Sequence, residues 1–322
     1  MNSGQMQAAV VCAPNEVQIR RVAFPSPREG QVRVRVRGCG VCGSNLAPWE
    51  GRPWFKYPLA PGELGHEGWG EVEALGPKVN GLHEGDVVAM LSYHSYAEYD
   101  TAPESSVVCL PAAIADKPFP GEALGCAMNV FKRCDIRPEQ TVAIVGIGFL
   151  GAVLTALCSR AGARVIAISR RPYALSVART MGAAEAIPMQ NHQDILQQVM
   201  DLTSGQGCER IIEAVGQQWP LDLAGELTRE RGRLIIAGYH QDGPRSVNLQ
   251  LWNWRGIDVI NAHEREPRIY REGVEAAVNA VASGQLDPFP LFTHRFPLDR
   301  LSDALNTMQE RPDNFLKALV IV

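Results

Sequence analysis

The feature that most constrains the fold is the stretch TVAIVGIGFLGAVLTALC at residues 141–158. It begins with a short, continuously apolar run typical of a buried strand, and an apolar-rich segment of helical length follows at once. Strands and helices continue to alternate to about residue 263, which predicts an α/β fold with a doubly wound parallel sheet covered on both faces. We expect strands at 163–170, 208–216, 233–240 and 257–263, and helices at 149–162, 172–183, 194–205 and 221–232.

The junction between the first strand and its helix carries GIGFLG at 146–151, which fits the pattern G-x-G-x-x-G. The first glycine can make a tight turn, the second lets the backbone approach a pyrophosphate, and the third lets the helix pack closely on the strand. The hexapeptide alone is weak evidence, but its place between a strand and a helix predicts a dinucleotide site on a Rossmann sheet. The residues assigned to this cofactor are Gly146, Gly148, Phe149, Leu150 and Gly151, with Val215 and Gly238 after two later strands.

The end of the second strand bears on which dinucleotide binds. A carboxylate commonly binds the adenosine ribose at this position. Here the residue 18 positions after Gly151 is Ser169, followed by Arg170 and Arg171. No carboxylate is present to bind a 2′-hydroxyl, and two guanidinium groups match the geometry of a phosphate. A solvated strand end is the alternative interpretation, and we favour NADP(H) over NAD(H).

The first 120 residues show another pattern, with short strands separated by glycine and proline. We therefore expect a β-rich domain at 1–123, a dinucleotide-binding domain at 124–264, and a tail at 265–322 that returns to the first domain. The strands expected in the β-rich domain lie at 31–38, 68–75, 85–91 and 95–102.

The composition is that of an ordinary globular protein, with 46% hydrophobic and 20% charged residues and a net charge of −4. This mild acidity, without a basic run, gives no electrostatic case for nucleic acid or an anionic membrane. Glycines interrupt the longest apolar stretches, and the first residues lack the pattern of a secretory signal. Most of the eight cysteines sit in apolar segments, as reduced, buried thiols do. We therefore expect a cytoplasmic protein.

Cys39 and Cys42 have the one suggestive cysteine spacing, in the glycine-rich run GCGVCGSN. By itself this C-x-x-C fits half of a structural zinc site, a redox pair, or one ligand of a catalytic metal. His66 and Glu67 follow in PGELGHEGWGEV, just before an expected strand. A catalytic zinc takes three protein ligands from nitrogen, sulfur and oxygen donors and keeps one open position.

These residues belong to a longer ordered series of motifs. Cys42-Gly43-Ser44 precedes Gly65-His66-Glu67-x-x-Gly70, and Gly85-Asp86-x-Val88 comes next. The series resembles the medium-chain dehydrogenase/reductase family, specifically its zinc-dependent alcohol and polyol dehydrogenases. The resemblance covers nearly the whole chain and implies a GroES-like fold for the β-rich domain. The segments RFPLDRLSDAL and WRGIDVINAHERE are most similar to the threonine and polyol dehydrogenase branches.

The resemblance implies a catalytic zinc bound by Cys42 and His66, with a third ligand at a fixed distance before the dinucleotide glycines. Glu122 lies 24 residues before Gly146, which matches the glutamate version of that pattern. Cys126 is an alternative third ligand, because cysteine sulfur also binds zinc. We instead expect Cys126 to be a packing residue on the following helix. Ala123 stands where the family has a proline.

The resemblance also implies one zinc per chain. The family's structural-zinc lobe of four close cysteines is missing, because AMLSYHSYAEY runs across that point. Cys39 is then expected to be a bystander.

The same resemblance gives roles to the neighbours of these ligands. Ser44 matches the hydroxyl that passes the alcohol proton towards the cofactor ribose, and Glu67 matches an acidic residue that tunes the metal. Asn45 replaces an aspartate that orients the ligand histidine, and its amide oxygen can still accept that hydrogen bond. Ala47 stands where many members carry a relay histidine, which leaves water, His94 or His263 for the proton.

These observations favour a zinc-dependent oxidoreductase that transfers a hydride between NADP(H) and an alcohol or polyol, or its ketone. A zinc-free quinone or enoyl-type reductase and a non-catalytic cofactor-binding protein are the alternatives. We expect a homodimer joined through the strand at 257–263, as in the family. Aromatic candidates for the substrate pocket are Trp49, Trp54, Phe55 and Tyr93.

Overall fold

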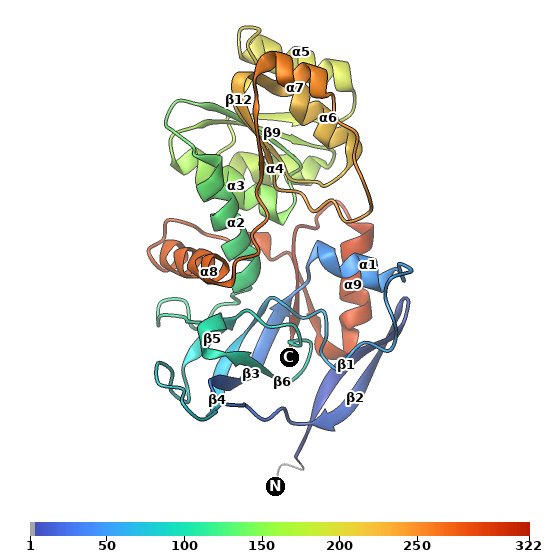
Figure 1. The fold of residues 1–322 in the computed structure, drawn as a ribbon, viewed down its shortest axis with the longest axis vertical. Coiled ribbons are helices and arrows are strands. Elements are labelled where there is room, and N and C mark those ends of the chain that lie inside the picture. The colour runs from blue at the N-terminus through green and yellow to red at the C-terminus, as the bar shows by residue number, and fades with distance from the viewer. Residues whose placement is uncertain (1–3) are drawn as a thin grey trace. The chain divides into compact units, whose positions relative to one another are not determined.

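The computed structural model describes residues 4–322, which form two compact units (Figure 1). One unit contains the residues up to 126 together with 265–322, and the other contains residues 127–264. Among the described residues, no helix is long and apolar enough to cross a membrane.

The unit at 127–264 is built on a six-stranded, wholly parallel sheet in the order β10-β9-β8-β11-β12-β13. Its apolar strands and covering helices form the α/β Rossmann architecture that the sequence predicts. Its strands are β8 (Thr141–Val145), β9 (Arg164–Ser169), β10 (Glu185–Pro188), β11 (Cys208–Glu213), β12 (Thr228–Ile236) and β13 (Asp258–Asn261). Its helices are α3 (Phe149–Arg160), α4 (Pro172–Thr180), α5 (His192–Leu202), α6 (Gln218–Leu227) and α7 (Leu249–Arg255).

The helix expected at 221–232 ends early, so that part of the prediction is wrong. α6 stops at Leu227, and Thr228 begins β12, which pairs with β11. The Thr228 hydroxyl donates to the Ala224 carbonyl at 2.8 Å and satisfies one of the last carbonyls of α6. The charged residues after Thr228 show no regular spacing of apolar side chains, so the sequence does not indicate a strand there. Their pairing with β11 is known only from the structure. β10 and α7 were not predicted because each is short.

The other unit contains a seven-stranded sheet and a separate hairpin of β1 (Gln5–Ala13) and β2 (Glu16–Ala23). The sheet has the order β14-β15-β3-β4-β5-β7, and β6 also pairs with β3. These strands are β3 (Gln31–Gly40), β4 (Gly68–Leu75), β5 (Val87–Met90), β6 (Tyr99–Pro103), β7 (Val107–Cys109), β14 (His294–Pro297) and β15 (Ala318–Ile321). The helices are α1 (Leu46–Trp49), α8 (Pro267–Ala282) and α9 (Leu301–Glu310), and α2 (Gly121–Cys134) begins in this unit.

The strand β3 organises this unit. Its valines 32, 34 and 36 are buried, whereas the intervening arginines lie on the other face, as strict alternation requires. β15, near the end of the chain, pairs antiparallel with β3 and sets Val320 opposite Cys39. The tail therefore completes the same sheet that leads into Cys42.

Candidate metal centre and nucleotide-binding loop

Three potential metal donors converge in the unit that contains β3. A ligand atom from each of Cys42, His66 and Glu67 lies within 4.8 Å of the other two, and this is the one such cluster within residues 4–322. Cys42 follows the end of β3, and the other two directly precede β4. β3 and β4 are paired with Cys39 opposite Gly68, so the two segments must meet at this end of the ladder.

The surroundings of His66 select the ring nitrogen that is available to a metal. Its Nδ1 is 2.9 Å from the carbonyl of Leu64, which accepts a hydrogen bond from Nδ1–H, so Nε2 is the nitrogen that can coordinate a metal. Burial lowers the pKa of His66, but the hydrogen bond and charge of Cys42, with the nearby Glu122 and Glu67 carboxylates, raise that pKa to about 10. The imidazole therefore lies beside acidic groups that favour a positive charge at this position.

Asn45 supports this geometry in a different way from the one expected. Its Oδ1 accepts from the backbone N–H of Cys42 at 3.0 Å and lies 3.0 Å from the Tyr96 hydroxyl. Its Nδ2 donates to the Leu64 carbonyl at 3.0 Å. The expected bond from His66 to the amide oxygen is therefore wrong, since Leu64 is the partner of both side chains. Asn45 acts on the histidine only through that shared carbonyl.

Glu67 is fully buried and has a charged partner that the sequence reasoning missed. The Nζ of Lys317 lies 2.6 Å from Oε1 and also forms an ion pair with Oε2. Burial lowers the pKa of Lys317, and the charges of Glu67 and Cys42 outweigh that effect and raise it. Gly40 gives the carboxylate its space, because a Cβ there would lie 1.8 Å from Oε2. The one feature of the sequence that could have indicated this buried partner is the position of Lys317 directly before the apolar run ALVIV.

Glu122 lies in the first turn of α2, near the cluster but outside the set of three mutually close donors. Its Oε1 accepts hydrogen bonds from the Tyr270 hydroxyl and, at 3.3 Å, from the Cys126 thiol. Burial, followed by the charge of Glu122, raises the pKa of Cys126 well above its usual range and keeps it a thiol. Cys126 therefore contacts the predicted ligand as well as packing on the helix.

The remaining residues predicted around the metal have different surroundings. Cys39 is completely buried in β3, and burial followed by the charge of Glu67 raises its pKa well above the usual range. Ser44 is half-buried, two residues after Cys42, and Ala47 is buried in α1. His94 is exposed in the loop before β6.

The aromatic residues predicted to line a substrate pocket do not form one group. Trp49 is fully buried in the apolar core and donates from Nε1 to Asn306 at 3.1 Å, so its assignment to a pocket wall is wrong. Trp54 is largely exposed beside Phe55, with ring centroids 6.1 Å apart. Tyr93 is exposed and its ring centroid lies 6.3 Å from that of His66. Tyr93 therefore lies beside one of the predicted metal ligands.

In the other unit, the glycine loop has the geometry of a phosphate-binding turn. Gly146 has a φ of +102°, and a Cβ there would lie 2.4 Å from the Val215 side chain. A Cβ on Gly151 would lie 2.0 Å from the Gly146 carbonyl oxygen, so the helix can approach the strand only with glycine there. Around Gly148 a Cβ would meet nothing within 4 Å. This open position caps α3, which starts with Phe149 and Leu150, and it fits a bound pyrophosphate.

Ser169 ends β9 and is buried, whereas Arg170 beside it is exposed. Arg171 precedes α4, and its guanidinium donates to the Ile147 carbonyl at 3.3 Å. That bond holds one predicted phosphate-binding side chain against the glycine loop.

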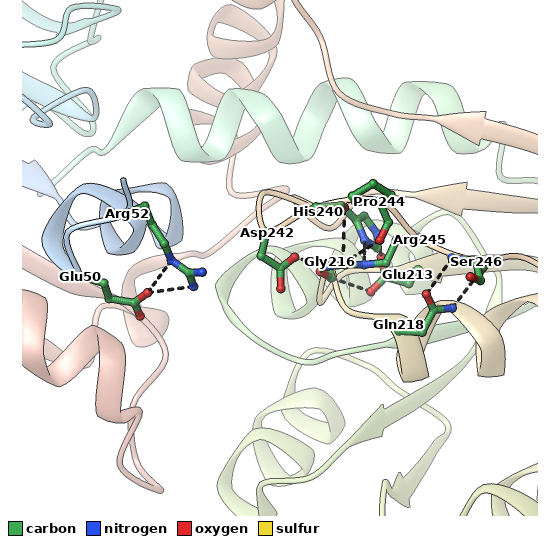
Figure 2. Close-up of polar contacts among 11 residues, drawn as sticks. Glu50, Arg52, Glu213, Gly216, Gln218, His240, Asp242, Pro244, Arg245 and Ser246 are labelled. Carbon is green, nitrogen blue, oxygen red and sulfur yellow. Dashed lines mark hydrogen bonds and ion pairs between the residues drawn. The ribbon is translucent and has the colours of Figure 1, made fainter. Parts of the chain in front are cut away.

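The loops after β11 and β12 meet beside this turn. The backbone N–H groups of Val215 and Gly216 donate to the buried carboxylate of Glu213 at 2.7 and 2.8 Å. A Cβ on Gly238 would lie 2.3 Å from the Gly216 nitrogen, so only glycine permits this approach. His240 contacts Glu213 at 3.1 Å in the same network (Figure 2).

His263, the other predicted proton acceptor, lies in this unit. It is exposed and stacks on Tyr239 with ring centroids 6.1 Å apart.

Comparison with known proteins finds matches along most of the chain. The family model of the alcohol dehydrogenase GroES-like domain matches residues 28–126, and that of zinc-binding dehydrogenases matches residues 150–280. The sorbitol dehydrogenase of Bacillus subtilis is 25% identical over 98% of this chain and 97% of its own length. The L-threonine 3-dehydrogenase of Pyrococcus abyssi is 25% identical over 91% of this chain and 92% of its own length.

Solved structures give the same result. An alcohol dehydrogenase from Thermus sp. ATN1 superposes with a TM-score of 0.83 at 25% identity, covering 98% of this chain and 100% of its own. The two family models together match segments of both units. The chain therefore belongs to the medium-chain dehydrogenase/reductase family, in its zinc-type alcohol and polyol dehydrogenase branch.

Proposed function

We propose that this protein is a zinc-dependent oxidoreductase that transfers a hydride between NADP(H) and an alcohol or polyol, or the corresponding ketone. The observation that carries the proposal is the convergence of the Cys42 thiol, the His66 imidazole and the buried Glu67 carboxylate, with Glu122 close enough to act on the His66 imidazole through its charge. Sulfur, nitrogen and oxygen donors from distant segments are the ligand set of a catalytic zinc.

Two carboxylates compete for the third ligand position, and the ion pairs favour Glu122. Glu67 is closer to Cys42 and His66, but its Oε1 accepts a hydrogen bond from Lys317, and its Oε2, which is buried without a hydrogen-bond partner, belongs to the same ion pair. Ligation by Glu67 would disrupt a buried ion pair, which is costly. Glu122 has neutral donors on one oxygen only, so its other oxygen can bind a metal without such a loss.

A bound zinc would supply Lewis-acid polarisation of the substrate oxygen, and a bound nicotinamide would supply or accept the hydride. The protein's own part is to orient these groups and to move one proton. Leu64 fixes the tautomer of His66, and Lys317 balances the negative charge that Glu67 adds beside the ligands. Ser44, two residues after Cys42, would take the alcohol proton and pass it on. Exit of that proton uses water, His94 or His263, because position 47 is alanine.

The substrate class follows from the relatives. Sorbitol dehydrogenase and L-threonine 3-dehydrogenase both match over most of the chain, and we extend the polyol chemistry of the first to this protein. The test is a screen of polyols and ketones on zinc-loaded protein with NADP(H). Turnover that disappears with a chelator and returns with zinc supports the proposal. Chelator-resistant reduction of a quinone or enone would favour a zinc-free reductase, and cofactor binding without any turnover would favour a non-catalytic protein.

We expect NADP(H) to bind more tightly than NAD(H) by more than tenfold, or about 1.4 kcal/mol. The arginines at 170 and 171 follow β9, at the strand end where a 2′-phosphate would need positive charge, and Arg171 also contacts the Ile147 carbonyl of the glycine loop. Ser169→Asp should erode or invert the preference, since it adds a carboxylate at that point. Titration calorimetry with both cofactors measures the ratio, and Arg179→Ala, at the far end of α4, should leave it unchanged. Equal binding of NAD(H) and NADP(H) by the unmodified protein would contradict the prediction.

We also expect a homodimer in solution, formed through β13. This strand lies at the edge of the six-stranded sheet, and pairing with a second copy would cover an edge that otherwise invites aggregation. Light scattering at micromolar concentration should give twice the mass of one chain. A monomeric mass would overturn this prediction without affecting the proposed chemistry.

A further inference from the structure

We propose that Tyr270 is a positioning residue that holds Glu122 so that this carboxylate binds zinc through one oxygen, Oε2. The inference rests on the proposed function, because it takes Glu122 as the third zinc ligand. Tyr270 acts only through Glu122 and makes no contact with substrate or cofactor in this proposal.

The hydrogen bonds at Glu122 carry the argument. The Tyr270 hydroxyl and the Cys126 thiol both donate to Oε1, so this oxygen is already occupied by two protein partners. The Cys126 thiol also lies 3.2 Å from the Tyr270 oxygen and can donate to it, so its one proton is shared between that oxygen and Oε1. A carboxylate with one oxygen bound in this way presents the other oxygen to a metal. Partners of this kind fix the orientation of metal ligands and contribute to metal affinity.

The packing of two helices explains why the phenol reaches the carboxylate. α2 carries Glu122, and α8 carries Tyr270 in its first turn. A Cβ on Gly125 would lie 2.8 Å from the backbone nitrogen of Val274 and 3.1 Å from the carbonyl carbon of Gly273. These close approaches leave no room for a side chain at Gly125 and bring the start of α8 onto the first turns of α2. Tyr270 is thereby fixed by backbone packing.

The two donors are unequal. A thiol is a weak hydrogen-bond donor and a phenol is a strong one. We therefore assign the positioning to Tyr270, and we expect Cys126→Ala to change zinc binding little.

The experiment is Tyr270→Phe, which removes the hydroxyl and keeps the ring. Zinc affinity, measured by competition with a chromophoric chelator, should fall about 10- to 100-fold, the usual effect of losing a partner of a metal ligand. In protein loaded with Co²⁺ instead of zinc, the visible absorption bands should shift because the carboxylate changes its mode of binding. Tyr99→Phe is the matched control, since Tyr99 lies in the same unit and packs against Phe24 without contact to Glu122.

A double-mutant cycle separates positioning from general loss of structure. In a Glu122→Gln background, Tyr270→Phe should have no further effect on zinc affinity. An equal loss in both backgrounds, or unchanged zinc affinity and Co²⁺ spectrum in the single variant, would overturn the inference. Failure of the unmodified protein to bind zinc would instead overturn the proposed function, so the two failures are distinguishable.

Discussion

Zinc content and turnover will both be lost when any of the three proposed ligands is replaced by alanine. The unmodified protein should hold about one zinc per chain, since the described residues offer one cluster of mutually close donors, Cys42, His66 and Glu67, with Glu122 nearby as the proposed third ligand. Cys42→Ala, His66→Ala and Glu122→Ala should each lower zinc occupancy towards zero. Mass spectrometry of the metal content measures this result directly. Binding of NADP(H) should survive, because the glycine loop lies in the other unit.

Four further outcomes would show which residue is the third ligand and whether a second zinc site exists. Cys39→Ala and Cys126→Ala should leave metal and activity nearly intact. Full occupancy in Glu122→Ala with loss in Cys126→Ala would make the cysteine the third ligand. Full occupancy in Glu122→Ala with loss in Glu67→Ala would show that zinc displaces Lys317. Two zincs per chain would require a second site involving Cys39.

Lys317→Met will lower the free energy of unfolding of the zinc-free protein by about 3–5 kcal/mol, the usual cost of leaving one member of a buried ion pair unpaired. Glu67 is 0% exposed and Lys317 is 5% exposed, so water cannot replace the lost partner. The site is already anionic around His66, which adds to the penalty. Urea denaturation of the two proteins measures the difference.

A surface pair and a double variant provide the controls. Lys78 pairs with Glu29 at 2.6 Å on the surface, and Lys78→Met should change stability by less than about 1 kcal/mol. Lys317→Met combined with Glu67→Gln should recover much of the lost stability, because the buried charge is gone. If Lys317→Met costs no more than Lys78→Met, the ion pair does not stabilise this end of the sheet.

Several features could be predicted from local patterns alone. The parallel sheet follows from continuous apolar strands, and the glycine loop follows from a spacing that a single turn enforces. Cys42 and His66 are recognisable because each lies in a glycine-rich turn beside a strand, and β3–β4 pairing then brings them together. These inferences succeed because hydrophobic periodicity and turn chemistry act over a few residues.

Other features were mistaken or missed because they depend on which segments meet. Trp49 is an aromatic residue of the kind that lines substrate pockets, yet α1 packs it into the core. There its indole N–H donates a hydrogen bond to Asn306. Asn45 has the right side chain to hold His66, but the Leu64 carbonyl takes that position. No local pattern reveals which of several acceptors a polar group will reach.

Local sequence patterns were enough to predict the two architectures, the glycine turn and the approach of Cys42 to His66. The surroundings of the two carboxylates depend on tertiary packing. This packing brings Lys317 to Glu67 across 250 residues and Tyr270 to Glu122 across 148 residues. Charge balance and hydrogen bonding at a buried site depend on groups that only the packing of strands and helices brings within 3 Å, and such partners leave no periodic trace in the chain.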